Sequence, residues 1–376
     1  MNISIAIITI IICLILFEAF LTVTDSSAPM HDRFFTNDDL LGWSSKPNLD
    51  TVHAERGFNT HIYTNSEGIR VATPGSVNKY DKPNGTKRIL VLGDSFAWGE
   101  GIEAEERFSN ILEKKYLNNT QVINMGVDSY GTTQEYLQLK NRGLKYKPDI
   151  VILLVFFGND IDDNLADRSN YYYRPVFTLD NNNLTLTNVP VPRNINDNSI
   201  LALKKYLSKH SHVYNLGSKA IYKYLSNPEP LPYAYGLFSN KEYSPDLQKG
   251  WNLTLAIIKE MDTTAKENNA TLLVVPVVSK ESLYEEDYRT MMQNTYSLNY
   301  IDYNNYSKPD DLLIKFGDEN NIEVLKLYPD FKKHYENGEQ LFLEQDGHWN
   351  AKGNQLAAEL INNKILNSTE LHERII

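Results

Sequence analysis

Short apolar runs alternate with helical patterns from residue 88 onward. Two segments, 107–116 and 132–146, place apolar residues at helical spacing, and Thr132 or Thr133 can cap the second helix. Around them lie three apolar runs that predict buried strands, at 89–92, 121–126 and 149–160. The last contains eight consecutive apolar residues, as is typical of strands covered on both faces in parallel sheets.

The alternation stops between residues 165 and 249 and then resumes. Within the interruption, 179–192 predicts a hairpin and 200–209 predicts a helix. The later elements are expected in the order helix, strand, helix, strand, helix, at 251–267, 271–278, 309–319, 322–327 and 354–366. The whole pattern predicts an α/β fold, with a doubly wound, flavodoxin-like parallel sheet of about five strands and right-handed crossovers. The segment 165–249 is then an insertion into this sheet.

The first 24 residues form a separate, apolar region. Residues 3–23 are apolar except for Ser4, two threonines and Glu18, and as a helix they would span roughly 30 Å. We therefore expect a transmembrane signal-anchor at 1–24, with the catalytic domain outside the cytoplasm; a cleaved signal peptide is the alternative. Residues 25–86 are turn-rich and predict an irregular extension with short strands, followed by the main domain at 87–366.

Charge and cysteine content exclude several classes of function. The net charge of −11 argues against nucleic acid or anionic lipid headgroups as partners, because both require a cationic surface. Cys13 is the only cysteine, which excludes disulfides, zinc fingers and thiol catalysis. Attachment to a membrane would therefore depend on the N-terminal helix alone.

Polar residues that suit nucleophilic catalysis follow the predicted strands. Ser95 lies in "GDSF" after the first strand, and "DGHW" precedes the final helix. Because reactive groups gather at the carboxyl ends of strands in open α/β sheets, Ser95 can attack an acyl carbon. His348 can remove the proton of the serine, and Asp346 can hold the imidazole in the required tautomer.

Two further strand ends supply groups that can stabilise an oxyanion. The second strand leads into "NMGVDSYGTTQ" and the third ends in "GND". The backbone N–H groups of Ser95 and Gly131, with the side-chain amide of Asn159, form the candidate oxyanion hole. A serine mechanism of this kind needs no cofactor. Taken singly, each of these residues is as well explained by an ordinary turn; their combination and order carry the prediction.

In this order the blocks resemble those of the SGNH (GDSL-like) hydrolase superfamily, from about residue 40 to 366. The resemblance assigns the nucleophile to Ser95, the oxyanion glycine to Gly131, with Gly126 as second choice, and the oxyanion asparagine to Asn159. The segments "GW…PN" and "NSEGIR" also look like the lead-in of one extracytoplasmic branch.

One departure concerns the acid that orients the histidine. The common family spacing sets an aspartate three residues before the histidine, where this chain has Gln345, and Asp346 lies two before. The shorter spacing looks like that of carbohydrate O-acetyltransferase relatives. Glu344 or a backbone carbonyl is the alternative to Asp346, and Trp349 either shields the imidazole or packs in the core.

These observations predict a membrane-anchored serine esterase that hydrolyses small acyl esters, with O-acetyl groups on an envelope glycan as the expected substrate. Transfer of the acyl group to a glycan is the first alternative, because the catalytic groups would be the same. A non-catalytic carbohydrate-binding protein on the same fold is the second, and a lipase or thioesterase the third.

Overall fold

The computed structural model describes residues 3–24, 33–55, 57–169, 172–193, 236–296 and 300–375, together with 206–207, 211, 213–214 and 217–218. The chain divides into two compact units. One comprises Met1–Phe35 and Asn194–Pro230, and the other comprises Thr36–Arg193 and Leu231–Ile376. All the candidate site residues belong to the second unit.

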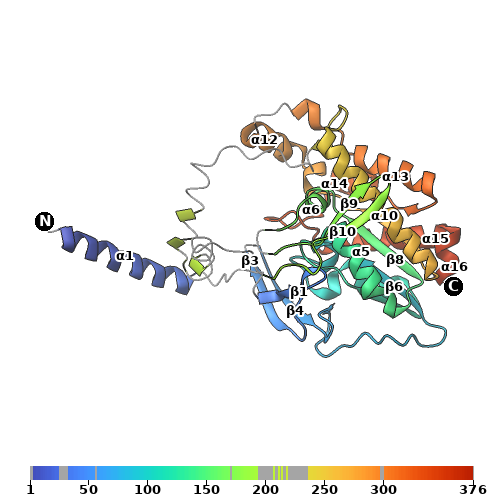
Figure 1. The fold of residues 1–376 in the computed structure, drawn as a ribbon, viewed down its shortest axis with the longest axis horizontal. Helices are drawn as coiled ribbons and strands as arrows, with labels where there is room; N and C mark the ends of the chain where they lie inside the picture. The colour runs from blue at the N-terminus through green and yellow to red at the C-terminus, as the bar shows by residue number, and fades with distance from the viewer. Residues whose placement is uncertain are drawn as a thin grey trace. The chain divides into compact units, whose positions relative to one another are not determined.

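A parallel sheet of five strands forms the centre of the second unit (Figure 1). Its order is β12-β11-β8-β6-β7, and the neighbouring strands run parallel. The strands are β6 (Lys87–Leu92), β7 (Thr120–Asn124), β8 (Ile150–Val155), β11 (Thr271–Pro276) and β12 (Glu323–Val324). This order reverses direction at β6, so the predicted doubly wound α/β sheet is confirmed.

Both faces of the sheet are covered, which explains the continuous apolar runs. Alternate residues of β6, β8 and β11 pack against α4 and α15 on one face, and α10 packs against α5, α6 and β11. Every residue of β8 and β11 is buried. The helices of this unit are α3 (Ser95–Trp98), α4 (Phe108–Ile111), α5 (Thr132–Asn141), α6 (Asp160–Leu165), α10 (Pro245–Glu267), α11 (Lys280–Leu283), α12 (Glu285–Tyr296), α13 (Lys308–Asn320), α14 (Tyr328–Glu336), α15 (Ala351–Asn367) and α16 (Thr369–Ile375).

The prediction that Thr132 or Thr133 caps α5 is wrong. Gly131 is the N-cap residue, and the Thr132 hydroxyl makes no hydrogen bond in the described part of the chain. The Thr133 N–H and hydroxyl both donate to Asn164 Oδ1 at 3.0 Å. The sequence suggested that a threonine side chain would accept a hydrogen bond from the first turn of α5. A side chain of α6 is the acceptor instead.

The extension before β6 contains short strands and no long helix within its described residues. β3 (Asp50–Glu55), β4 (Phe58–Thr64) and β5 (Arg70–Val71) form an antiparallel sheet, preceded by β1 (Phe35–Asp38) and β2 (Gly42–Ser45). The buried guanidinium of Arg70 donates to the carbonyl oxygens of Trp98 and Gly99 at 3.0 and 2.6 Å. The extension is thereby fixed to the helix that begins at Ser95.

The region predicted as an insertion begins after α6. Its hairpin is formed by β9 (Val176–Asp180) and β10 (Asn183–Thr187), which pair antiparallel. The helix predicted over 200–209 lies largely outside the described residues. The alternation of helices and strands resumes with α10 at Pro245.

The first unit contains α1 (Ile3–Thr24). Across the residues that the structure describes, no helix reaches the combination of length and apolarity that a bilayer crossing requires. The transmembrane helix predicted over 1–24 is therefore without support from the structure.

Candidate active site

Ser95 lies in a tight strand-to-helix turn, residues 93–99, which we call the nucleophile turn. Gly93 follows β6 with φ +151°, and a Cβ built on it would lie 2.8 Å from Ala97 Cβ. The Asp94 carboxylate caps α3 by accepting from Phe96 N–H (2.9 Å), and Gly99 ends the helix in the left-handed conformation. This geometry leaves Ser95 as the first helical residue, 8 % exposed.

The structure brings His348 onto Ser95. The Nε2 atom of His348 lies 2.7 Å from Ser95 Oγ, across 253 residues of sequence. On the other side of the ring, Nδ1 is hydrogen-bonded to Asp346 Oδ1, which also accepts from the His348 backbone N–H at 2.8 Å. Asp346, rather than Glu344 or a backbone carbonyl, therefore contacts the imidazole. The three side chains form the hydrogen-bonded chain that nucleophilic acyl transfer requires.

Mutual stabilisation shifts the pKa values of this pair in opposite directions. Burial opposes the charged form of His348, but the hydrogen bond and charge of Asp346 outweigh it and raise the pKa of the imidazole above its ordinary value. Burial likewise opposes ionisation of Asp346, and the hydrogen bonds and charge of His348 hold the pKa of its carboxyl below its usual range. The arrangement thus favours the imidazolium that forms when Ser95 loses its proton.

The segment 343–348, which we call the acid–base loop, is held by a residue that sequence reasoning missed. Lys280 Nζ donates to the carbonyl oxygens of Leu343, Glu344 and Asp346 at 2.9, 3.2 and 3.1 Å. Lys280 begins α11, just after β11. The rule that functional groups follow strand ends would have indicated it, but a lone lysine has no recognisable motif.

The indole of Trp349 packs in the core. It is 2 % exposed, its Nε1 donates to the Val278 carbonyl at 2.9 Å, and its ring lies 5.2 Å from the rings of both Phe96 and Phe331. Of the two roles predicted for Trp349, packing is the one that these contacts describe.

The two candidate oxyanion glycines occupy different surroundings. Gly126 presses against α3, where a Cβ would lie 2.6 Å from the Trp98 backbone nitrogen, and its N–H already donates to Asn124 Oδ1 (2.9 Å). Gly131 lies against α6, and its N–H faces Gln134 Oε1 at the longer distance of 3.3 Å. Gly126 is thus a packing glycine, and Gly131 is the freer donor of the two.

Asn159 and Gly131 meet at Asp163. Asn159 donates one amide hydrogen to Asp163 Oδ2 (2.9 Å), and a Cβ on Gly131 would lie 2.9 Å from Asp163 Cβ. Arg174 pairs with the other carboxylate oxygen of Asp163 at 2.6 Å. The second amide hydrogen of Asn159 remains for a ligand, because a primary amide carries two donors. Asp163 and Arg174 orient this amide and are further residues that sequence reasoning missed.

Several buried carboxyl groups lie around the nucleophile turn. Burial raises the pKa of Asp94 to about 7 and that of Asp128 to about 6. Burial, reinforced by neighbouring acids, also raises the pKa values of Glu135 and Asp160 well above their ordinary range. Burial therefore disfavours the ionised form of these carboxyl groups and limits the negative charge that would oppose an oxyanion next to Ser95.

The extension contributes a buried pair of its own. His53 Nε2 lies 2.6 Å from Glu100 Oε1, with both side chains less than one-tenth exposed. His53 comes from β3 and Glu100 follows α3. No motif marks either residue, so only the fold could reveal the pair.

Comparison with known families extends these observations. The family described as "SGNH hydrolase-like domain, acetyltransferase AlgX" matches residues 235–374, the segment that carries Asp346 and His348. Over this segment the chain is similar to the SGNH hydrolase-like domain of that family. The match supports the resemblance predicted from the sequence.

Solved structures of SGNH and GDSL-type proteins are similar to this chain at low identity. A member of the lipolytic G-D-S-L family from Veillonella parvula is 14% identical with a TM-score of 0.37, and covers 74% of this chain and 97% of its own. A lipase/acylhydrolase from Enterococcus faecalis is 12% identical with a TM-score of 0.39 (74% and 95% covered). An acetylxylan esterase from Geobacillus stearothermophilus is 10% identical with a TM-score of 0.37 (76% and 95%). No curated protein matches the chain at a significant level. Similarity at these scores carries no information about activity.

Proposed function

We propose that this protein is a serine-dependent enzyme of acyl esters, and that it hydrolyses small acyl groups, O-acetyl groups first among them. The observation that carries the proposal is the 2.7 Å approach of His348 Nε2 to Ser95 Oγ, with Asp346 on the opposite ring nitrogen. Nucleophile, base and orienting acid have these relations in acyl-transfer enzymes on unrelated folds.

The geometry supports a two-step reaction. Ser95 Oγ attacks the ester carbonyl as its proton passes to His348 Nε2, and the carbonyl oxygen becomes an oxyanion. The backbone N–H of Ser95, the N–H of Gly131 and the Asn159 amide are the proposed donors to that oxygen. When the tetrahedral intermediate collapses, the alcohol leaves with the proton from His348, and an acyl-serine remains. Water, deprotonated by His348, then attacks the acyl carbon, releases the carboxylic acid and restores Ser95.

Transfer of the acyl group to a sugar hydroxyl is the second candidate function. It is favoured by the description of the matching family, which includes an acetyltransferase. The two functions differ only in the acceptor of the second step. Incubation with an acetyl donor, with and without a soluble oligosaccharide, separates them: transfer yields an acetylated sugar, and hydrolysis yields acetate alone.

The location of the enzyme is a further proposal. We infer an extracytoplasmic catalytic domain attached through residues 1–24, and the support is the apolar pattern of that segment. Fractionation of cells that express the chain tests it, since a soluble cytoplasmic protein would contradict the proposal.

The test of the catalytic proposal is Ser95→Ala, assayed with p-nitrophenyl acetate. We expect kcat to fall by at least about 10⁴-fold with the thermal transition retained, because the other groups cannot replace the nucleophile. Ser109→Ala is the matched control, because Ser109 is also buried but contacts Asn124 rather than His348. Activity retained in Ser95→Ala, or lost equally in Ser109→Ala, would reject the assignment.

A further inference from the structure

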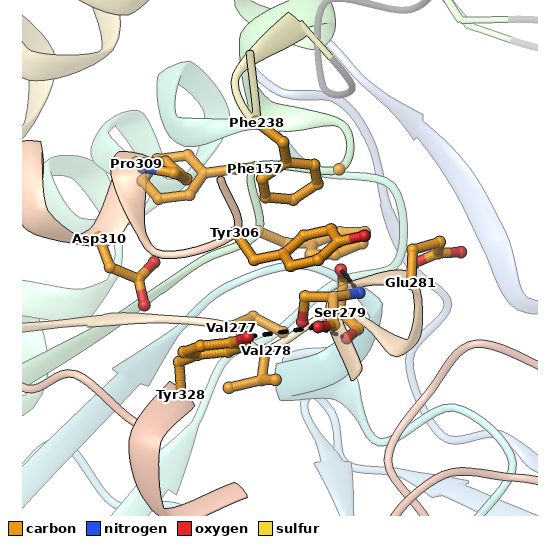
Figure 2. Close-up of a pocket in the computed structure, with 13 residues that line it drawn as sticks. Phe157, Phe238, Val277, Val278, Ser279, Glu281, Tyr306, Pro309, Asp310 and Tyr328 are labelled. Carbon is orange, nitrogen blue, oxygen red and sulfur yellow. Dashed lines mark hydrogen bonds between the residues drawn. The ribbon is translucent and has the colours of Figure 1, made fainter. Parts of the chain in front are cut away.

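A largely apolar cavity of about 260 Å³ lies at the carboxyl ends of β8 and β11 (Figure 2). Aromatic side chains from distant parts of the chain line it, namely Phe157, Phe238, Tyr306 and Tyr328. Its volume is slightly below the usual range for small-molecule sites and suits a single ring rather than an extended chain of sugars.

The cavity lies next to the triad. Phe156 lines it, and the Phe156 ring packs at 4.7 Å from that of Phe96, which in turn lies 4.7 Å from the His348 ring. Gly158 also lines the cavity and immediately precedes Asn159. A ligand in the cavity is therefore two aromatic rings away from the catalytic imidazole.

Two carboxyl groups line the cavity, those of Glu281 and Asp310, and Asp310 is the more deeply buried. Asp310, in the first turn of α13, is 7 % exposed, and among the described residues the charges of Lys326 and Asp311 act on its carboxyl without a hydrogen bond to it. Figure 2 shows this carboxyl turned inward, on the side of the cavity formed by Pro309 and Tyr328. A buried acid without a partner is unfavourable, and it persists most readily where a ligand supplies the missing bond.

The neighbouring cations are committed elsewhere. Lys326 forms an ion pair with Asp311, whose side chain is more than half exposed. Lys308 Nζ donates to the carbonyl oxygens of Ser239 and Lys241 at 2.8 and 2.6 Å. Burial raises the pKa of Asp310 to about 7, and the charge of Lys326 only partly offsets this. At neutral pH the group can thus donate as well as accept a hydrogen bond.

We propose that this cavity binds the alcohol half of the ester, and that Asp310 recognises a hydroxyl group on a saturated ring of the kind that a sugar residue presents. An alkyl chain in the cavity would leave Asp310 unpaired, whereas a hydroxylated ring pairs it and packs its C–H faces on the aromatic walls. The inference rests on the proposed function and adds to it the specificity for the alcohol.

The test compares two acetyl esters that differ in their alcohol, methyl 6-O-acetyl-glucopyranoside and ethyl acetate. In Asp310→Leu we expect KM for the sugar ester to rise about 10-fold or more with kcat nearly unchanged, since the lost bond contributes to binding rather than to chemistry. Constants for ethyl acetate should change less than twofold. Asp318→Leu is the matched control, because this acid on the same helix is exposed and its removal leaves the ion pair of Asp311 with Lys326 intact.

Several results with the esters would overturn the proposal. One is an equal rise in KM for both esters in Asp310→Leu. A second is a higher kcat/KM of this variant for p-nitrophenyl hexanoate relative to p-nitrophenyl acetate, which would indicate an acyl pocket. A third is a larger rise in KM for acetylcholine than for the sugar ester, which would indicate a cation site. Asp310→Leu should also raise the thermal transition, because an unpaired buried acid is removed; a lower transition would indicate a structural role.

A binding arm separates this proposal from the catalytic one. Calorimetry with methyl glucopyranoside uses the full chain carrying Ser95→Ala, with and without Asp310→Leu. If this binding depends on Asp310 while the chain with Ser95 intact hydrolyses no acetyl ester, the cavity is supported and the catalytic proposal is rejected. Binding that is absent, or that Asp310→Leu leaves unchanged, would reject the cavity.

Discussion

The nucleophile turn (93–99) and the acid–base loop (343–348) supply the two halves of the triad, but they are fixed in different ways. The turn is buried, and the Asp94 cap and Gly93 and Gly99 at positive φ shape it from within, while Arg70 donates to the carbonyl oxygens at its end. The loop is half exposed, with His348 and Asp346 side chains 21% and 30% accessible. Its carbonyl oxygens converge on the ammonium group of Lys280.

The difference teaches where each half of the site is encoded. The backbone of the turn depends on its cap and its two glycines, so that a change at those positions should affect folding together with activity. The loop depends on a bond from a residue more than sixty positions away, so that a change there should affect chemistry with little effect on folding. Three substitutions test this contrast, starting with the largest expected effect on the rate.

Asp346→Asn should lower kcat on p-nitrophenyl acetate by about 10⁴-fold, because an amide stabilises the wrong tautomer of His348 and does not stabilise the imidazolium. The pH dependence provides a second measurement. In the unaltered enzyme, activity should rise with pH through a pKa above the ordinary histidine value, since only the neutral imidazole accepts the proton. Residual activity of the variant should rise at a lower pH, because the group that raises the pKa of His348 has been removed.

Glu344→Gln is the control for this prediction. Glu344 lies in the same loop and was the alternative acid from the sequence, but Asp346 contacts the ring. We expect less than a twofold change in kcat. A larger loss of kcat in Glu344→Gln than in Asp346→Asn would show that Glu344, and not Asp346, orients the imidazole.

Lys280→Met should lower kcat/KM by roughly 10- to 100-fold, the effect expected when a catalytic group moves by about 1 Å. The urea midpoint should change little. Lys280 is a positioning residue, so the pH–rate profile should also shift, as Asp346 contacts His348 less closely. Lys352→Met, on an exposed lysine at the start of α15, is the control, and a similar loss there would contradict the role given to Lys280.

Gly93→Ala should destabilise the fold by about 1–3 kcal/mol, measured by urea unfolding. The added methyl group would meet Ala97 Cβ at 2.8 Å and Leu154 Cβ at 3.0 Å, at a φ of +151° that alanine avoids. Gly347→Ala in the acid–base loop is the matched control, because nothing lies within 4 Å of its added Cβ and its φ is not positive. It should change stability by less than about 0.5 kcal/mol. Equal destabilisation by both substitutions would remove the contrast between turn and loop.

The sequence predicted the parts whose signals are local. Apolar runs identified β6, β7, β8 and β11 and therefore the strand ends that carry polar residues. The GDSF and DGH segments pointed to Ser95 and His348, which lie in hydrogen-bond contact, and the oxyanion role of Asn159 from the GND segment stays a prediction. The helices α12 and α14 were missed, because their apolar patterns are short and irregular. Lys280, Arg174 and the His53–Glu100 pair were missed for another reason: each acts through a contact with a different element of the fold, and single charged residues have no distinctive spacing. The prediction of the α5 cap was wrong for the same reason, because Asn164, a residue of another helix, accepts the hydrogen bond from the Thr133 N–H.

The most direct test of the central claim is mass spectrometry of the enzyme after reaction with a fluorophosphonate. The tryptic peptide 89–107 contains one serine, so an adduct on it locates the nucleophile without ambiguity. We predict a single adduct on this peptide, formed at a rate that rises with pH as His348 loses its proton and that is abolished in Ser95→Ala. An adduct on a different serine in an enzyme that hydrolyses acetyl esters, or esterase activity with no adduct at all, would contradict the triad.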